Sequence, residues 1–296
     1  NTPWGQNFVR SRAEAYLKNK LKTELHIGYL GYGLPKFIVL KDVLFKDQAG
    51  DTLLAAEELK IDLDMLKLIH KNVDVQQLVF KGVHAHIYRN LPDTNYNFTY
   101  IINAFTGNKP NEPVKPKNTT ASPLNIDLDR VKLDDIHFRM NDYTGGMQLA
   151  VNLEHLDLHI KKVDLGKMLF HIKDLAIAGL QTTFAQDTSY LPVKHSTEKT
   201  KLQLIADNAN LEHIAFQYNN SLNKFLFGMQ LGKIQLQLNR FGLEDNVVDV
   251  KKMAVNNSDV VLTIGKLSTA PTFIDTLIKK DTTEGWHVKG GDIAFA

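Results

Sequence analysis

An internal repeat of strand-like segments is the feature that most constrains the fold of this 296-residue chain. The apolar pattern of Leu133–Phe138 recurs 78 residues later in Leu211–Phe216. Two further segments after each of these keep the same offset, and a divergent first copy begins at Lys36. A period of this length indicates stacked supersecondary modules that bury each other's edges. The sequence therefore predicts a three-strand unit that occurs about three times.

Within each segment the apolar positions alternate, but their phase slips once. Leu133 is followed by Ile136 and Phe138 on the apolar side, so one extra residue stands between two alternating runs. A one-residue slip moves side chains to the other face of a straight strand, whereas a β-bulge restores the face and bends the strand. We expect a mainly β protein whose elongated repeat sheet is curled into a groove, with its apolar side inward.

The first residues predict an amphipathic α-helix instead of a strand. Phe8, Tyr16, Leu17 and Leu21 recur at helical spacing. The glycine cluster that follows, within residues 28–33, predicts a turn.

The chain then divides into units by its pattern and its polar breaks. The expected organisation is an N-terminal amphipathic helix (1–27), a first three-strand unit with a short helix (36–105), a flexible Pro/Lys loop (106–123), a second unit (124–186), a loop (187–199), a third unit (200–266) and the start of a further unit (267–296).

The apolar side of this sheet must be shielded from water. The sheet closes on itself, packs as a dry sandwich, or leaves a groove for an apolar ligand, and periodicity alone does not choose among these. The residues predicted to line the groove are Val43, Phe45, Leu59, Ile61, Leu78, Phe80, Leu133, Ile136, Phe138, Leu156, Leu158, Ile172, Leu175, Ile177, Ile214, Phe216, Ile234, Leu236, Val250, Met253 and Val255.

Composition excludes several function classes. Lys and Arg number 35 against 33 Asp and Glu, which argues against a dedicated nucleic-acid binder. The absence of cysteine removes thiolate metal sites and Cys nucleophiles, and no Gly-x-Ser-x-Gly signature is present. Histidine pairs such as His84/His86 and His155/His159 have no third metal ligand near them in sequence. We therefore predict no enzyme activity, no catalytic residue, no metal site and no cofactor.

Several stretches in order resemble one family. Phe8–Arg12, Lys41–Ala55, Asn97–Phe105 and Val131–Met140 are similar to the N-terminal region of TamB-like proteins of the AsmA superfamily, most of all those of Bacteroidota. The resemblance covers most of the chain.

The resemblance implies a periplasmic bridge-like lipid transfer protein of the Gram-negative envelope. Its partners would be phospholipid, whose acyl chains lie in the groove, the inner membrane, reached through an anchor missing from this chain, and an outer-membrane β-barrel assembly protein. The chain is then expected to be a piece of a longer protein that starts just after the membrane span. The alternative function is a periplasmic scaffold that assists outer-membrane protein assembly through exposed strand edges.

Overall fold

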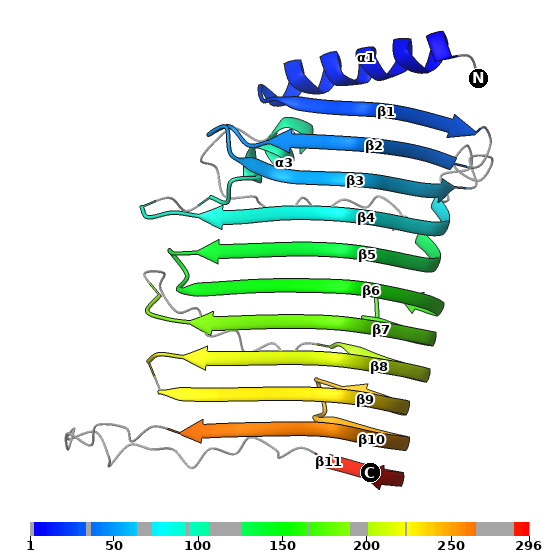
Figure 1. The fold of residues 1–296 in the computed structure, drawn as a ribbon, viewed down its shortest axis with the longest axis vertical. Helices are drawn as coiled ribbons and strands as arrows, with labels where there is room; N and C mark the ends of the chain where they lie inside the picture. The colour runs from blue at the N-terminus through cyan, green and yellow to red at the C-terminus, as the bar shows by residue number, and fades with distance from the viewer. Residues whose placement is uncertain are drawn as a thin grey trace.

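The computed structural model describes residues 3–33, 37–63, 73–92, 95–106, 126–164, 166–189, 201–222, 224–264 and 287–295. All of its strands belong to one open sheet, in which they follow one another in sequence order (Figure 1). The mainly β prediction is therefore confirmed. The elements are α1 (Pro3–Leu21), β1 (Leu25–Gly33), β2 (Phe37–Lys46), β3 (Thr52–Leu63), β4 (Val73–Arg89), α3 (Thr99–Thr106), β5 (Ile126–Asp142), β6 (Met147–Asp164), β7 (Leu169–Gln186), β8 (Gln203–Asn220), β9 (Phe225–Gly242), β10 (Val247–Ile264) and β11 (His287–Phe295).

The direction of pairing marks the repeated unit. Strands pair antiparallel within β2–β4, β5–β7 and β8–β10. The units meet at parallel joints, β4–β5, β7–β8 and β10–β11. A parallel joint needs a long return connection, because the chain must travel back along a strand before it pairs again. The predicted loops lie almost wholly outside the described residues, in 107–125 and 190–200, as does 265–286 of the further unit.

A line of irregular positions crosses the sheet and bends it. At this line, which we call the crease, the register omits one residue on each strand from β1 to β10. Strands β2, β4, β5, β7, β8 and β10 have positive φ there, which is the bulge that the phase slip predicts. The crease residues are Gly28, Asp42, Glu57, Gly82, Asp135, Glu154, Gly179, His213, Gly232 and Asn257.

The backbone repeats with the same period as the sequence. Asp135 has a φ of 55° and His213, 78 residues later, has a φ of 53°. Gly179 and Asn257 form another such pair, at 64° and 51°. Non-glycine residues rarely adopt this left-handed region. Its recurrence at fixed spacing shows that the bend is part of the repeated unit.

Glycine in the crease permits a close approach between strands. A Cβ on Gly82 would lie 2.4 Å from the side chain of Glu57, and one on Gly179 would lie 2.3 Å from that of Glu154. Both glycines also have positive φ. At these two places the crease sets a residue without a side chain beside a long acidic one.

The N-terminal region differs from the prediction. The helix ends at Leu21, and Leu25–Gly33 forms strand β1 instead of a helix end and a turn. The helix lies along β1 (Figure 1) and satisfies part of its free edge. Glu14 Oε1 accepts a hydrogen bond from the backbone N–H of Ile27 at 2.6 Å, and Arg10 Nη1 donates to the carbonyl of Ile27 at 2.8 Å. Covering an edge strand in this way blocks pairing with another chain.

Only part of the expected apolar stripe of α1 packs against the sheet. Leu17 packs against the apolar cluster of β1–β4 and Leu21 is buried. Trp4, Phe8 and Tyr16 are exposed at 78%, 52% and 59%. The helix thus has a second, outward apolar surface that the sheet does not cover.

Candidate functional site

The candidate site is the apolar face of the sheet, here called the inner face. Cross-strand partners share a face, so the register shows which side chains form rows across the strands. One row on each side of the crease is entirely apolar from the first strand that it crosses to β9. The first row is Leu30, Leu40, Leu59, Phe80, Leu133, Leu156, Ile177, Leu211 and Ile234, and it continues to Val255 on β10. The second row is Ile27, Val43, Ala56, Val83, Ile136, Leu153, Leu180, Ile214 and Leu231.

Every residue that the sequence assigned to the groove lies in these rows or in the neighbouring rows of the same face. Ile61, Leu78, Leu158, Leu175, Leu236 and Met253 belong to a third row, which also contains Val131 and Ala209. Phe45, Phe138 and Phe216 belong to a fourth, on the far side of the crease. Ile172 and Val250 belong to a fifth, in which Ala206 and Leu238 lie between them.

Sequence analysis missed other members of the same face. Ile27, Ala56, Val83 and Leu153 are buried, at 4%, 5%, 8% and 8% exposure. Ile27 lies on β1, in the part for which the sequence predicts the end of the N-terminal helix, and the others lie next to the phase slip. These residues are recognised by their register partners in the apolar rows, and the register is known only from the strand pairing.

The described residues leave the inner face half-buried and place no second sheet over it. Val43, Ile214, Ile234 and Val250 are buried, whereas the other predicted lining residues are half-buried. The described strands form one sheet, so no second described sheet packs on this face, and the dry sandwich is not the arrangement of this part of the chain. An apolar surface of this extent normally marks a binding site.

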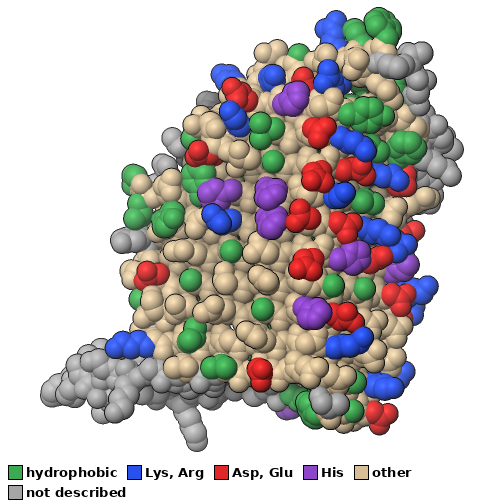
Figure 2. All heavy atoms as spheres, viewed as in Figure 1, with side chains coloured by type: hydrophobic (Ala, Val, Ile, Leu, Met, Phe, Trp, Pro, Cys, Tyr) green, Lys and Arg blue, Asp and Glu red, His purple; other side chains and the backbone are tan. Residues whose placement is uncertain are grey.

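The opposite, outer face is polar. Ion pairs cross its strands, among them Lys41 with Glu58 at 2.9 Å and Lys233 with Glu212 at 2.8 Å. Figure 2 shows charged and histidine side chains spread over one broad face of the sheet, with few large apolar patches. The sheet thus separates an apolar surface from water on one side only.

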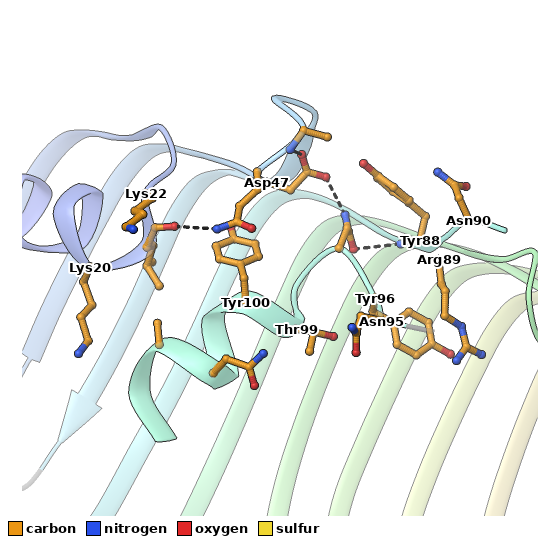
Figure 3. A pocket seen from close by; sticks show the side chains of 16 residues that line it. Lys20, Lys22, Asp47, Tyr88, Arg89, Asn90, Asn95, Tyr96, Thr99 and Tyr100 are labelled. Atoms are coloured by element: carbon orange, nitrogen blue, oxygen red, sulfur yellow. Dashed lines mark hydrogen bonds between the residues drawn. The ribbon is translucent and has the colours of Figure 1, made fainter. Parts of the chain in front are cut away.

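A polar pocket of about 600 Å³ lies at one end of the strands, between α1, α3 and the ends of β2 and β4 (Figure 3). Asp47, 3% exposed, accepts backbone N–H bonds from Ala49 and Asp51 at 2.9 Å each. The side chain of Asn97 donates to Asp47 at 3.1 Å and accepts from the N–H of Tyr88 at 3.1 Å. These bonds attach the segment that leads into α3 to the strand ends.

A buried ion pair anchors the same segment to the first parallel joint. Arg89 binds Asp142 through two hydrogen bonds, one of them 2.9 Å long, and Asp142 is fully buried. Tyr96 donates its hydroxyl to Asp142 at 2.8 Å, and its ring lies 4.6 Å from the Arg89 guanidinium. Burial alone would raise the pKa of Asp142, but hydrogen bonds from Arg89, Gly145 N–H and Tyr96 together lower it.

The tyrosines of this pocket are neutral groups. Burial raises the pKa of Tyr88, and its hydrogen bonds to Asp47 and Asp51 raise it further. Burial likewise raises the pKa of Tyr100, whose hydroxyl donates to the carbonyl of Lys46 at 3.1 Å. The Tyr100 hydrogen bond therefore attaches α3 to the end of β2. Sequence analysis did not find the pocket residues, because they come from distant segments.

The family model for the N-terminal domain of TamB matches residues 1–270. No curated protein matches the chain in sequence. Among the described helices, none has the length and hydropathy that a membrane span requires.

Proposed function

The chain belongs to the TamB family of envelope proteins, and from that premise we propose that its inner face carries the acyl chains of phospholipids between membranes. The observation that supports this proposal is the set of unbroken apolar rows, which cross the joints between units as well as the strands within them. A groove used for conduction needs such continuity, because a polar gap would stop an acyl chain.

The hydrophobic effect supplies the binding free energy. Each buried methylene contributes roughly 0.8 kcal/mol, so a fully sheltered tail of about fifteen methylenes gains on the order of 12 kcal/mol. The open groove shelters one side of a tail and provides part of this. Headgroups remain in water at the open side.

Movement along the groove follows from the repeat. Neighbouring strands lie about 4.8 Å apart, and a tail that shifts by one strand exchanges one apolar side chain for another. The free energy changes little with each step, so no single position traps the lipid. With eleven strands, the described sheet gives a path of roughly 48 Å.

We propose a periplasmic location, with the α1 end toward the inner membrane and the other end toward an outer-membrane β-barrel assembly protein. The exposed aromatic side chains of α1 support this orientation, because Trp and Tyr favour the membrane–water interface. Arg12, whose guanidinium lies 5.4 Å from the Phe8 ring, adds positive charge that anionic headgroups attract.

The test is lipid bound to the purified chain. Native mass spectrometry and solvent extraction should find co-purifying phospholipid, and a photoreactive phenylalanine analogue at Phe138 should crosslink to acyl chains. Ile136→Asp or Ile214→Asp, on the inner face, should abolish that lipid while far-UV circular dichroism stays unchanged. Gln217→Asp, an exposed outer-face substitution, is the matched control and should retain it.

The outcomes separate the two candidate functions. A lipid-free protein whose Phe138 probe captures no acyl chain contradicts the conduit. Crosslinks from strand edges to outer-membrane proteins, together with that absence, support the assembly scaffold instead. Lipid retained in full by Ile214→Asp would show that the rows are not the binding surface.

A further inference from the structure

A group of histidine and aspartate side chains on the outer face is not used by the proposed groove. His84 on β4 and His137 on β5 are register partners across the first parallel joint. Their rings stack with centroids 4.5 Å apart and planes 12° from parallel. Asp135 Oδ1 lies 3.0 Å from His137 Nε2. One ligand atom from each of the three residues lies within 4.8 Å of the others.

Asn152 on β6 orients His137. Its side-chain oxygen lies 2.8 Å from His137 Nδ1, so Nδ1 carries the proton that this hydrogen bond needs. In the metal-free protein Nε2 donates a hydrogen bond to the Asp135 carboxylate. A metal ion bound at Nε2 would take the place of that proton, because a histidine ligand must be deprotonated at the metal-binding nitrogen. Metal-binding histidines commonly have this arrangement, in which the second ring nitrogen donates to a fixed acceptor.

The backbone holds Asp135 in place. It is a crease residue with a φ of 55°, a conformation that aspartate and asparagine adopt more readily than most residues. The bulge turns its side chain to the exposed outer face, on the same strand as His137. The carboxylate position is therefore set by the bend of the sheet.

We propose that His84, Asp135 and His137 form a Zn²⁺ site on the outer face of the first parallel joint. Two imidazoles and one carboxylate are ligands that zinc accepts, with water in the fourth position. Ligands about 2.0–2.2 Å from a tetrahedral zinc lie roughly 3.3 Å from each other. The Asp135–His137 pair, at 3.0 Å, is already near that separation, and a ring nitrogen of the exposed His84 lies within 4.8 Å of both ligand atoms.

Bound zinc would clamp β4 to β5. At this joint the two strands are neighbours in space, while a long connection separates them in the chain. A metal that binds the folded protein and not the unfolded chain stabilises the fold by mass action. The inference does not depend on lipid transfer.

Other histidines of the outer face provide the control. His171 contacts Asp207 at 2.8 Å, which resembles the Asp135–His137 contact. Across the described residues, however, only the group around His84 brings three such ligand atoms together. A His171→Gln variant therefore removes an ordinary histidine–carboxylate contact without touching the proposed site.

The experiment is a titration of the untagged chain with Zn²⁺ alone, followed by calorimetry, with Co²⁺ as a spectroscopic probe. We expect one saturable zinc per chain and a rise in melting temperature that saturates with it. His84→Gln and Asp135→Asn should each weaken binding by at least about tenfold and remove the thermal shift. Asparagine keeps the left-handed backbone preference, so Asp135→Asn tests the ligand without disturbing the crease.

Unchanged circular dichroism of the variants shows that they fold, and His171→Gln should bind like the parent chain. The proposal is overturned if the parent chain shows no saturable binding. It is also overturned if His84→Gln retains the full affinity, or if His171→Gln loses as much as His84→Gln does.

Discussion

The two described parallel joints within residues 73–220 end in equivalent residue pairs, which are charged in the first joint and neutral in the second. Placing the neutral pair in the first joint tests how much its ion pair contributes to stability. Arg89 and Asp142 are register partners at the end of β4–β5, and Gln186 and Asn220 occupy the corresponding places at β7–β8. The amide pair is joined by a 3.2 Å hydrogen bond. The perturbation is Arg89→Gln, Asp142→Asn and the double variant, which installs the second joint's pair in the first.

Each single substitution should lower the free energy of unfolding by about 3 kcal/mol, at the low end for a broken buried ion pair. In Arg89→Gln the buried carboxylate keeps its bonds from Tyr96 and Gly145, which limits the loss. In Asp142→Asn the guanidinium keeps the Tyr96 ring. The double variant leaves no buried charge, so it should also cost about 3 kcal/mol instead of the additive 6, a coupling of about 3 kcal/mol.

The assay is urea unfolding followed by circular dichroism, with hydrogen exchange of the Tyr143 amide, which donates to the Arg89 carbonyl at 3.0 Å. Local exchange matters because repeat arrays can unfold in steps. Additive losses in the double variant would refute the reasoning, since they would show that the two side chains act independently.

The pH dependence gives a second readout of the same pair. The pKa of Asp142 is lowered in the folded protein, so its contribution to stability is present above its unfolded pKa of about 3.9. It is lost as the pH falls through the lower folded pKa. The advantage of the parent chain over Asp142→Asn should therefore shrink below about pH 4. An advantage that stays constant down to pH 2 would contradict the lowered pKa.

Gly82→Ala places a Cβ 2.4 Å from a neighbouring side chain at a φ of 57°, so urea unfolding should show a loss of about 1–2 kcal/mol. Gly228→Ala, with its nearest atom 4.0 Å away, should change stability by less than about 0.5 kcal/mol, and equal losses would contradict the crease argument. Arg10→Ala uncovers backbone carbonyls on β1 and should cause concentration-dependent association in light scattering, whereas a monomer at every concentration would show that the Arg10 bonds are not needed to protect this edge. Trp4→Ser with Phe8→Ser should weaken flotation with anionic vesicles by at least about tenfold, and unchanged flotation would separate α1 from the membrane.

The two faces of the sheet and the positions of its bends can be predicted from the sequence, because both depend on the local alternation of apolar residues. Alternation between Leu133 and Ile136 slips by one residue, and the structure places the bulge between them, at Asp135. Apolar rows follow once similar strands are stacked in the same register. This is why every predicted lining residue lies on one face, although its contact with lipid stays a prediction.

The glycines after α1 show where prediction from the local sequence fails. The sequence predicts a turn at Gly28, but this residue lies in β1, where a Cβ would come within 2.8 Å of the Asp42 Cβ. Glycine is needed here for a close approach between strands, and a sequence does not distinguish that need from a turn. The edge strand was missed for this reason.

The sequence does not predict the polar clusters at the joints, because the register of parallel strands decides which distant residues meet there. Arg89 and Asp142 are 53 residues apart and meet only through the β4–β5 register. Comparison of the repeated joints shows whether such a cluster recurs in every unit. In the second joint the places of His84 and His137 are taken by Gln181 and Ala215, although the crease keeps its backbone shape. The shared backbone carries the groove through every unit, and the side chains that differ between joints carry chemistry confined to one of them. A zinc site at the first joint should therefore have no counterpart at the second.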